Sequence, residues 1–149
     1  MNPLATATAR GVSDRAFQES PTSTGKNVSE FAGRSLLSVL FLLSGVGKIG
    51  AYAATAAYMS SAGVPSVLLP VVIATEVLGA TAIILGWQTR ITAFLLAGYT
   101  LLAALVFHIN FADQMEMIMF LKNVSIAGGF LLLVVNGAGP LSLDRRRAK

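Results

Sequence analysis

Four ionisable side chains lie inside or at the ends of long apolar runs of this sequence: Lys48, Glu76, His108 and Lys122. An ionisable group at the centre of a membrane-spanning helix costs on the order of 3 kcal/mol on insertion scales, so each one requires a structural or functional reason. Two lysines and one glutamate could hold an anion or a polarised carbonyl, and a histidine could relay a proton. We therefore predict that these four residues form a ligand-binding pocket.

The position of each charge along its run supports this prediction. At about 1.5 Å of rise per residue, Lys48, Glu76 and Lys122 lie near the middle or in the outer half of their spans. Small residues share their helical faces, such as Gly45 beside Lys48 and Gly79 beside Glu76. Small residues mark places where membrane helices approach one another, so we expect the polar side chains to face the interior.

Simpler interpretations remain open for the same residues. The long stem of Lys48 could extend to the membrane boundary, and Glu76 with one lysine could form a purely structural ion pair. His108 lies at the end of a span and could be an ordinary interfacial residue. Met115, Met117 and Met119 could suggest copper(I), but residues two apart on a helix point to different sides. We therefore predict no metal site.

The elements that carry these residues are predicted from composition. The chain of 149 residues is 54% hydrophobic and 12% charged, about half the usual charged fraction of a soluble domain, and its mean hydropathy is +0.70. Apolar runs near the ~20 residues needed to cross a bilayer predict spans over residues 31–51, 65–87, 91–108 and 115–135. A weaker, alanine-rich helix over 52–61 is expected at the interface. The predicted fold is an all-α bundle of four transmembrane helices.

The tails and the basic residues predict the topology. We expect residues 1–30 to be a disordered cytoplasmic tail, 31–140 the membrane domain, and 141–149 a basic cytoplasmic tail. Asn27 and Glu30 have the spacing of a capping box before the first span. The basic residues of short flanks are Arg10, Arg15, Lys26, Arg34, Arg90, Arg145, Arg146, Arg147 and Lys149. All fall on one side for four spans, which predicts a multi-pass protein with both termini in the cytoplasm.

Several classes of function are disfavoured by the residues. The net charge of +4 comes from the tails and one turn, without the basic stripe and interleaved aromatics of a nucleic-acid-binding protein. The chain contains no cysteine, so it has neither disulfides nor thiolate ligands, and its single histidine cannot supply bis-histidine haem ligation. The expected partner is the lipid bilayer. An oligomer is compatible with the sequence.

Four motifs together resemble the DoxX family of small bacterial membrane proteins. They are FLLSGVGKIG in the first span, ATEVLGATAIILG in the second, FHINF after the third, and FLKNVSIAGGFLLLVVNGAGPLSLD at the end. The resemblance covers about residues 31–144 and implies a four-helix bundle in the bacterial cytoplasmic membrane. It also implies that Lys48, Glu76, His108, Lys122 and Asn123 fall on recurring positions of the family, which adds Asn123 to the predicted ligand-binding site.

The resemblance adds a redox context, because a DoxD-type relative forms part of a thiosulfate:quinone oxidoreductase. The first functional hypothesis is a redox-associated subunit, with a redox partner protein, that binds a quinone head group or a small anion. In it Glu76 orients the lysines. The second hypothesis is a non-catalytic membrane scaffold, and the third is a small proton-coupled exporter built on the intramembrane Glu76. The sequence leaves open whether the protein is an enzyme.

Overall fold

The computed structural model describes residues 22–147, which form helices joined by short connections. The long helices are α2 (Thr22–Gly50), α4 (Leu69–Leu85), α5 (Thr89–Phe107) and α6 (Gln114–Asn136). The short ones are α3 (Tyr52–Ser61), the 3₁₀ turn η1 (Ser66–Leu68) and α7 (Leu143–Arg147). In this part of the chain four helices are long and apolar enough to cross a membrane, so the predicted all-α fold with four spans and a short helix between the first two is confirmed.

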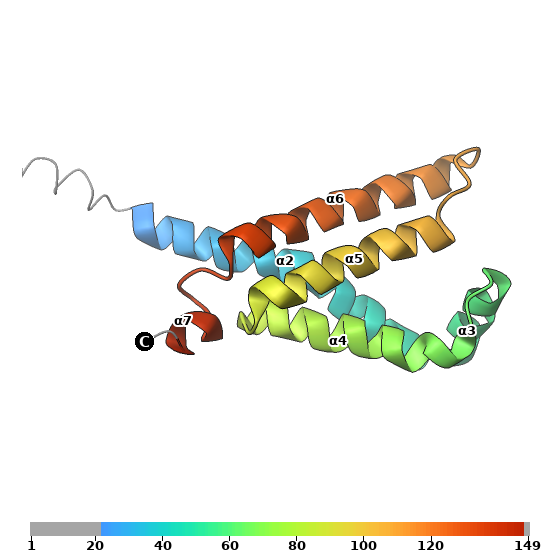
Figure 1. Ribbon diagram of the computed structural model, residues 1–149, viewed down its shortest axis with the longest axis horizontal. Helices are drawn as coiled ribbons and strands as arrows, with labels where there is room; N and C mark the ends of the chain where they lie inside the picture. Colours follow the sequence, from blue (N-terminus) through green and yellow to red (C-terminus); the bar gives the residue numbers. More distant parts are fainter. Residues whose placement is uncertain (1–21, 148–149) are drawn as a thin grey trace, which may run out of the picture.

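The four long helices form two pairs, with α2 against α4 and α5 against α6 (Figure 1). A core of interlocked apolar side chains joins the pairs, and Phe41, Ile83, Leu96 and Phe130 lie at its centre. Phe41 and Phe130 meet edge to face with ring centroids 5.3 Å apart, a geometry favoured by aromatic quadrupoles. The outer faces of the helices carry exposed leucine, isoleucine, valine and phenylalanine side chains, as expected for surfaces solvated by lipid.

The first span differs from its prediction at the N-terminal end. Helix α2 begins at Thr22, so residues 22–30, expected to belong to a disordered tail, are helical. Asn27 and Glu30 lie within this helix, and the predicted capping box at its start is wrong. The side chains of Lys26 and Glu30 pair across one turn at 3.9 Å, which favours the helix. The predicted disorder of residues 1–21 lies outside the described part of the chain.

The remaining boundaries agree closely with the sequence. Helix α3 covers the expected residues 52–61, although its place at a membrane interface stays a prediction. Pro70 stands in the first turn of α4. A backbone N–H at this position has no partner within the helix, so proline loses no hydrogen bond there and does not disrupt the helix.

Candidate functional site

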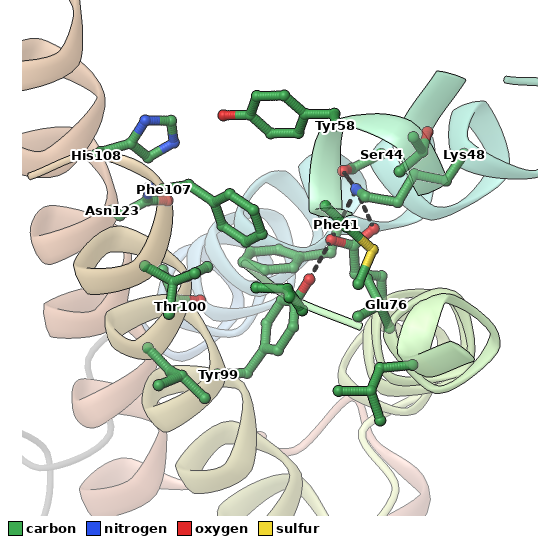
Figure 2. A pocket seen from close by; sticks show the side chains of 18 of the residues that line it. Phe41, Ser44, Lys48, Tyr58, Glu76, Tyr99, Thr100, Phe107, His108 and Asn123 are labelled. Carbon is green, nitrogen blue, oxygen red and sulfur yellow. Dashed lines mark hydrogen bonds and ion pairs between the residues drawn. The ribbon is translucent and has the colours of Figure 1, made fainter. Parts of the chain in front are cut away.

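A cavity of about 470 Å³ lies between the two helix pairs. All five predicted site residues line it: Lys48, Glu76, His108, Lys122 and Asn123. Figure 2 shows Lys48, Glu76, His108 and Asn123 among the lining side chains. They come from α2, α4, the end of α5 and α6, while α3 contributes Tyr58 and Met59. Most of the remaining lining is apolar, including Leu40, Phe41, Val72, Leu102 and Phe107. The volume falls within the ~300–1,000 Å³ common for small-molecule sites.

Lys48 and Glu76 form an ion pair on the α2–α4 side of the cavity. Lys48 Nζ lies 2.8 Å from Glu76 Oε2 and 3.0 Å from Oε1, and it also donates to Ser44 Oγ at 2.6 Å. The Glu76 side chain is 5% exposed and that of Lys48 is 23% exposed. Lys48 therefore points inward, and the alternative in which its stem extends to the membrane boundary does not describe this structure.

The contacts of Lys48 leave it without a free donor. An ammonium group carries three hydrogens, and the three acceptor atoms around Nζ use all of them. A ligand could bond to Lys48 only by displacing Ser44 or one oxygen of Glu76. The two charges also cancel, so this side of the cavity is formally neutral.

Tyr99 completes this network, and the sequence analysis missed it. Its hydroxyl donates to Glu76 Oε1 at 2.7 Å from the α5 side, as the dashed lines in Figure 2 show. A tyrosine in the middle of an apolar span was a usable signal, because a buried phenolic hydroxyl normally finds a partner. With Ser44, Lys48, Glu76 and Tyr99, the network joins three of the four spans. We call these four residues the Lys48 network.

The α5–α6 side of the cavity carries polar groups that are largely free. Lys122 is exposed and contacts Met119 Sδ at 3.1 Å, a weak acceptor that leaves two of its three hydrogens available. Asn123 is partly buried, and its side-chain amide has no hydrogen-bond partner among residues 22–147. Within the described residues Lys122 forms no ion pair with Glu76, so the expectation that Glu76 orients both lysines is correct only for Lys48.

His108 lies where α5 ends and pairs with a glutamate that the sequence analysis did not single out. Its Nδ1 is 2.6 Å from Glu116 Oε2, which belongs to the first turn of α6. Asp113 caps that turn by accepting hydrogen bonds from the backbone N–H groups of Met115 and Glu116. A short connection between two antiparallel spans brings their ends together, which was the available signal for this pair.

Glycine allows the helices that carry the Lys48 network to approach closely. A Cβ on Gly45 would lie 2.7 Å from Val77 Cγ2 and 3.1 Å from Glu76 Cβ. The prediction that small residues mark helix contacts is therefore correct for α2 and α4. Gly79 likewise lies against Leu96 of α5. Within residues 22–147, no three His, Asp or Glu side chains gather closely enough to hold a metal ion.

The opposite end of the bundle is held together by the segment that follows α6. Arg34 of α2 is 2% exposed, and its guanidinium donates to the carbonyl oxygens of Ala138 and Leu141. The sequence analysis treated Arg34 only as a topology signal. In the structure its hydrogen bonds connect α2 to the segment of residues 137–141 that follows α6. Arg90 and the arginines of α7 lie at this same end, opposite α3 (Figure 1).

Asp144 of α7 caps the start of α5. Its two carboxylate oxygens accept from the backbone N–H groups of Gln88 and Thr89 at 2.8 and 2.9 Å. Burial alone would raise the pKa of Asp144, but the hydrogen bonds from Thr89 and Gln88 and the charge of Arg147 outweigh it and lower that pKa below its ordinary value. The Ser-Leu-Asp sequence thus has a structural role, since it joins the end of the chain to the α4–α5 turn.

Comparison with known proteins identifies the family. The model of the DoxX family matches residues 30–109, from α2 to the end of α5 and the histidine that follows it. The chain belongs to the DoxX family. Among its relatives, Inner membrane protein YqjF of Escherichia coli K12 is 48% identical over 120 residues, covering 80% of this chain and 92% of that protein.

A second relative supports the same assignment. Inner membrane protein YphA of Escherichia coli K12 is 41% identical over 121 residues, covering 76% of this chain and 86% of that protein. No solved structure matches the chain. The DoxX match includes Lys48, Glu76 and His108 and ends before Lys122, so the free polar groups on α6 lie beyond the part of the chain that the family model matches.

Proposed function

We propose that this DoxX protein is a redox-associated subunit of the bacterial inner membrane that binds a quinone head group in the cavity between its helix pairs. The observation that carries the proposal is the distribution of free hydrogen-bond donors. Lys122 and Asn123 offer unoccupied donors to a largely apolar cavity, and the neutral Lys48 network lies across from them. A quinone has carbonyl acceptors on a flat apolar ring, which matches this combination.

The aromatic lining supports the same ligand. Phe41 and Tyr99 lie on the α2 and α5 sides with ring centroids 6.4 Å apart, and Phe107 lines the cavity nearer to His108 (Figure 2). Flat apolar rings favour stacked or edge contacts with another aromatic ring. A small oxyanion could also use Lys122 and Asn123, but it would gain little from these side chains, so the quinone is the better match.

The topology completes the proposal. Arg34, Arg90 and the arginines of α7 lie at one end of the bundle, while Asp113 and Glu116 lie at the other. Positive residues favour the cytoplasmic side, so we assign both termini to the cytoplasm and the His108 end of the cavity to the outer face. The relatives YqjF and YphA, named as inner membrane proteins, support this membrane.

Extraction of ligands from the purified protein tests the proposal. The protein is purified in a mild detergent, and mass spectrometry measures quinone per mole of wild type, Lys122→Met and Lys26→Met. Lys26 is an exposed lysine of α2 outside the cavity, so its variant is the matched control. We expect wild type and Lys26→Met to retain quinone and Lys122→Met to lose most of it. Equal retention by all three would remove Lys122 from the site, and no quinone in any would reject the proposal.

The same preparation distinguishes an oxyanion. Quinone-free protein is heated with and without thiosulfate, and the unfolding temperature is followed by circular dichroism. A ligand that binds only the folded state raises this temperature. Stabilisation of wild type but not of Lys122→Met by thiosulfate, without quinone in the purified protein, would replace the quinone by a small anion.

The scaffold hypothesis is favoured by one observation, the saturation of Lys48. A lysine whose three hydrogens are all bonded within the protein suits a structural ion pair. In the proposal we therefore give the Lys48 network a structural role and the ligand contacts to α6. An exporter would need a carboxylate free to meet a cation, and the contacts of Glu76 with Lys48 and Tyr99 weigh against it.

A further inference from the structure

The two ring nitrogens of His108 have different roles in this structure. Nδ1 lies 2.6 Å from Glu116 Oε2, and a carboxylate can only accept a hydrogen bond. Nδ1 therefore carries the hydrogen. In a neutral imidazole the other nitrogen, Nε2, is then an acceptor with a free lone pair. Glu116 thus fixes the tautomer of His108.

The lone pair of Nε2 is available to an occupant of the cavity. His108 lines the cavity, whereas Glu116 is absent from its lining, so the edge of the ring that bears Nδ1 is occupied by a residue outside the cavity. Nε2 has no hydrogen-bond partner within residues 22–147. Glu116 stands in the first turn of α6, so its carboxylate is positioned by the backbone of that helix.

We propose that His108 Nε2 accepts a hydrogen bond from a hydroxyl of the bound head group, so that the site binds the quinol more tightly than the quinone. This inference rests on the proposed function. A quinol hydroxyl can donate to Nε2, whereas a quinone carbonyl would place its lone pair against that of Nε2. Lys122 and Asn123 can donate to an oxygen in either oxidation state, so they do not discriminate. His108 is thereby a specificity-determining residue, and Glu116 is a positioning residue.

The test compares the two oxidation states of one ligand. Decylubiquinol and decylubiquinone are titrated by calorimetry, under argon and in detergent, into protein freed of quinone. All titrations are done at the same pH, about pH 8. One hydrogen bond of ordinary net strength predicts about fivefold tighter binding of the quinol to wild type. Glu116→Gln should bring the ratio of the two dissociation constants close to one, since an amide can donate as well as accept and no longer fixes the tautomer.

Asp113→Asn is the matched control, because it makes the same change of charge in the same connection. Its side-chain oxygen can still cap α6, so it should keep the quinol preference of wild type. Equal affinity of wild type for both forms, or an unchanged preference in Glu116→Gln, would overturn this inference while leaving quinone binding in place. Failure of both forms to bind wild type would overturn the proposed function with it.

Discussion

Removing both partners of the Lys48–Glu76 ion pair should cost much less than the sum of the two single losses. In Lys48→Met the Glu76 carboxylate, 5% exposed, keeps only the hydrogen bond from Tyr99. Leaving one member of a buried pair without its partner costs about 3 kcal/mol or more in the free energy of unfolding. In Glu76→Gln the ammonium keeps Ser44 and an amide oxygen, and it is partly exposed, so we expect a loss of about 2 kcal/mol.

The double variant tests whether these losses come from the pair itself. When Lys48→Met and Glu76→Gln are combined, no charge remains at either position, and Tyr99 can still donate to the amide oxygen. The expected cost is again about 2 kcal/mol, for an imperfectly bonded amide. The coupling energy is then about 3 kcal/mol, roughly a 150-fold change in the unfolding equilibrium.

Reversible unfolding in mixtures of mild detergent and SDS, followed by far-ultraviolet circular dichroism, measures all four proteins of this cycle. Losses that add to within about 0.5 kcal/mol would show that the two charges do not depend on one another. That result would refute the structural role we give to the Lys48 network, and Lys48 would again become a candidate ligand contact. Lys26→Met should be neutral, because that lysine is exposed.

Three further predictions concern Arg34, Asp144 and the membrane topology. Arg34→Met should lower the free energy of unfolding by about 3 kcal/mol in the same detergent assay, because two charged hydrogen bonds to backbone carbonyls are lost. Arg34→Lys should recover only part of this, since an ammonium lacks the planar fork of arginine. The pKa of Asp144 is lowered in the folded state, so the unfolded state takes up the proton first as the pH falls below the ordinary carboxylate pKa. Wild type should therefore lose stability relative to Asp144→Asn in this acidic range, and the difference in free energy of unfolding between the two should not change with pH near neutrality. Green fluorescent protein fused after Lys149 should fluoresce, because we place this end in the cytoplasm. Alkaline phosphatase inserted in the connection at Asp113 should be active, because we place that connection in the periplasm. The reverse pattern would overturn the assigned orientation.

The fold could be predicted from the sequence because lipid imposes a simple rule on each span. A run of about 20 apolar residues can satisfy its backbone in hydrocarbon only as a helix, and four such runs are evident. The start of α2 could not be located in this way. Residues 22–30 extend the helix beyond the apolar run, where lipid no longer dictates the structure and local pairs such as Lys26 with Glu30 contribute instead.

The site was predictable only as a set of residues. Intramembrane charge correctly singled out side chains that line one cavity, but the rotation of each helix decides which of them touch. Lys48 and Glu76 are 28 residues apart, and no periodicity within one helix determines that they meet while Lys122 remains apart. Glu116 was missed for a different reason, since a carboxylate in the first turn of a helix is common and only the structure shows that His108 lies beside it.

In this cavity, a charged side chain inside the membrane is not necessarily free to contact a ligand. Lys48 is the more deeply held lysine, yet its hydrogens are all engaged, whereas Lys122 is exposed and has only a weak sulfur acceptor. A ligand gains most where a donor or acceptor would otherwise remain unpaired, because bonding there displaces no existing partner. The α5–α6 side, with Lys122, Asn123 and the Nε2 of His108, is therefore where recognition should occur. The α2–α4 side then provides a neutral wall of the cavity, in which Lys48 and Glu76 are already paired with each other.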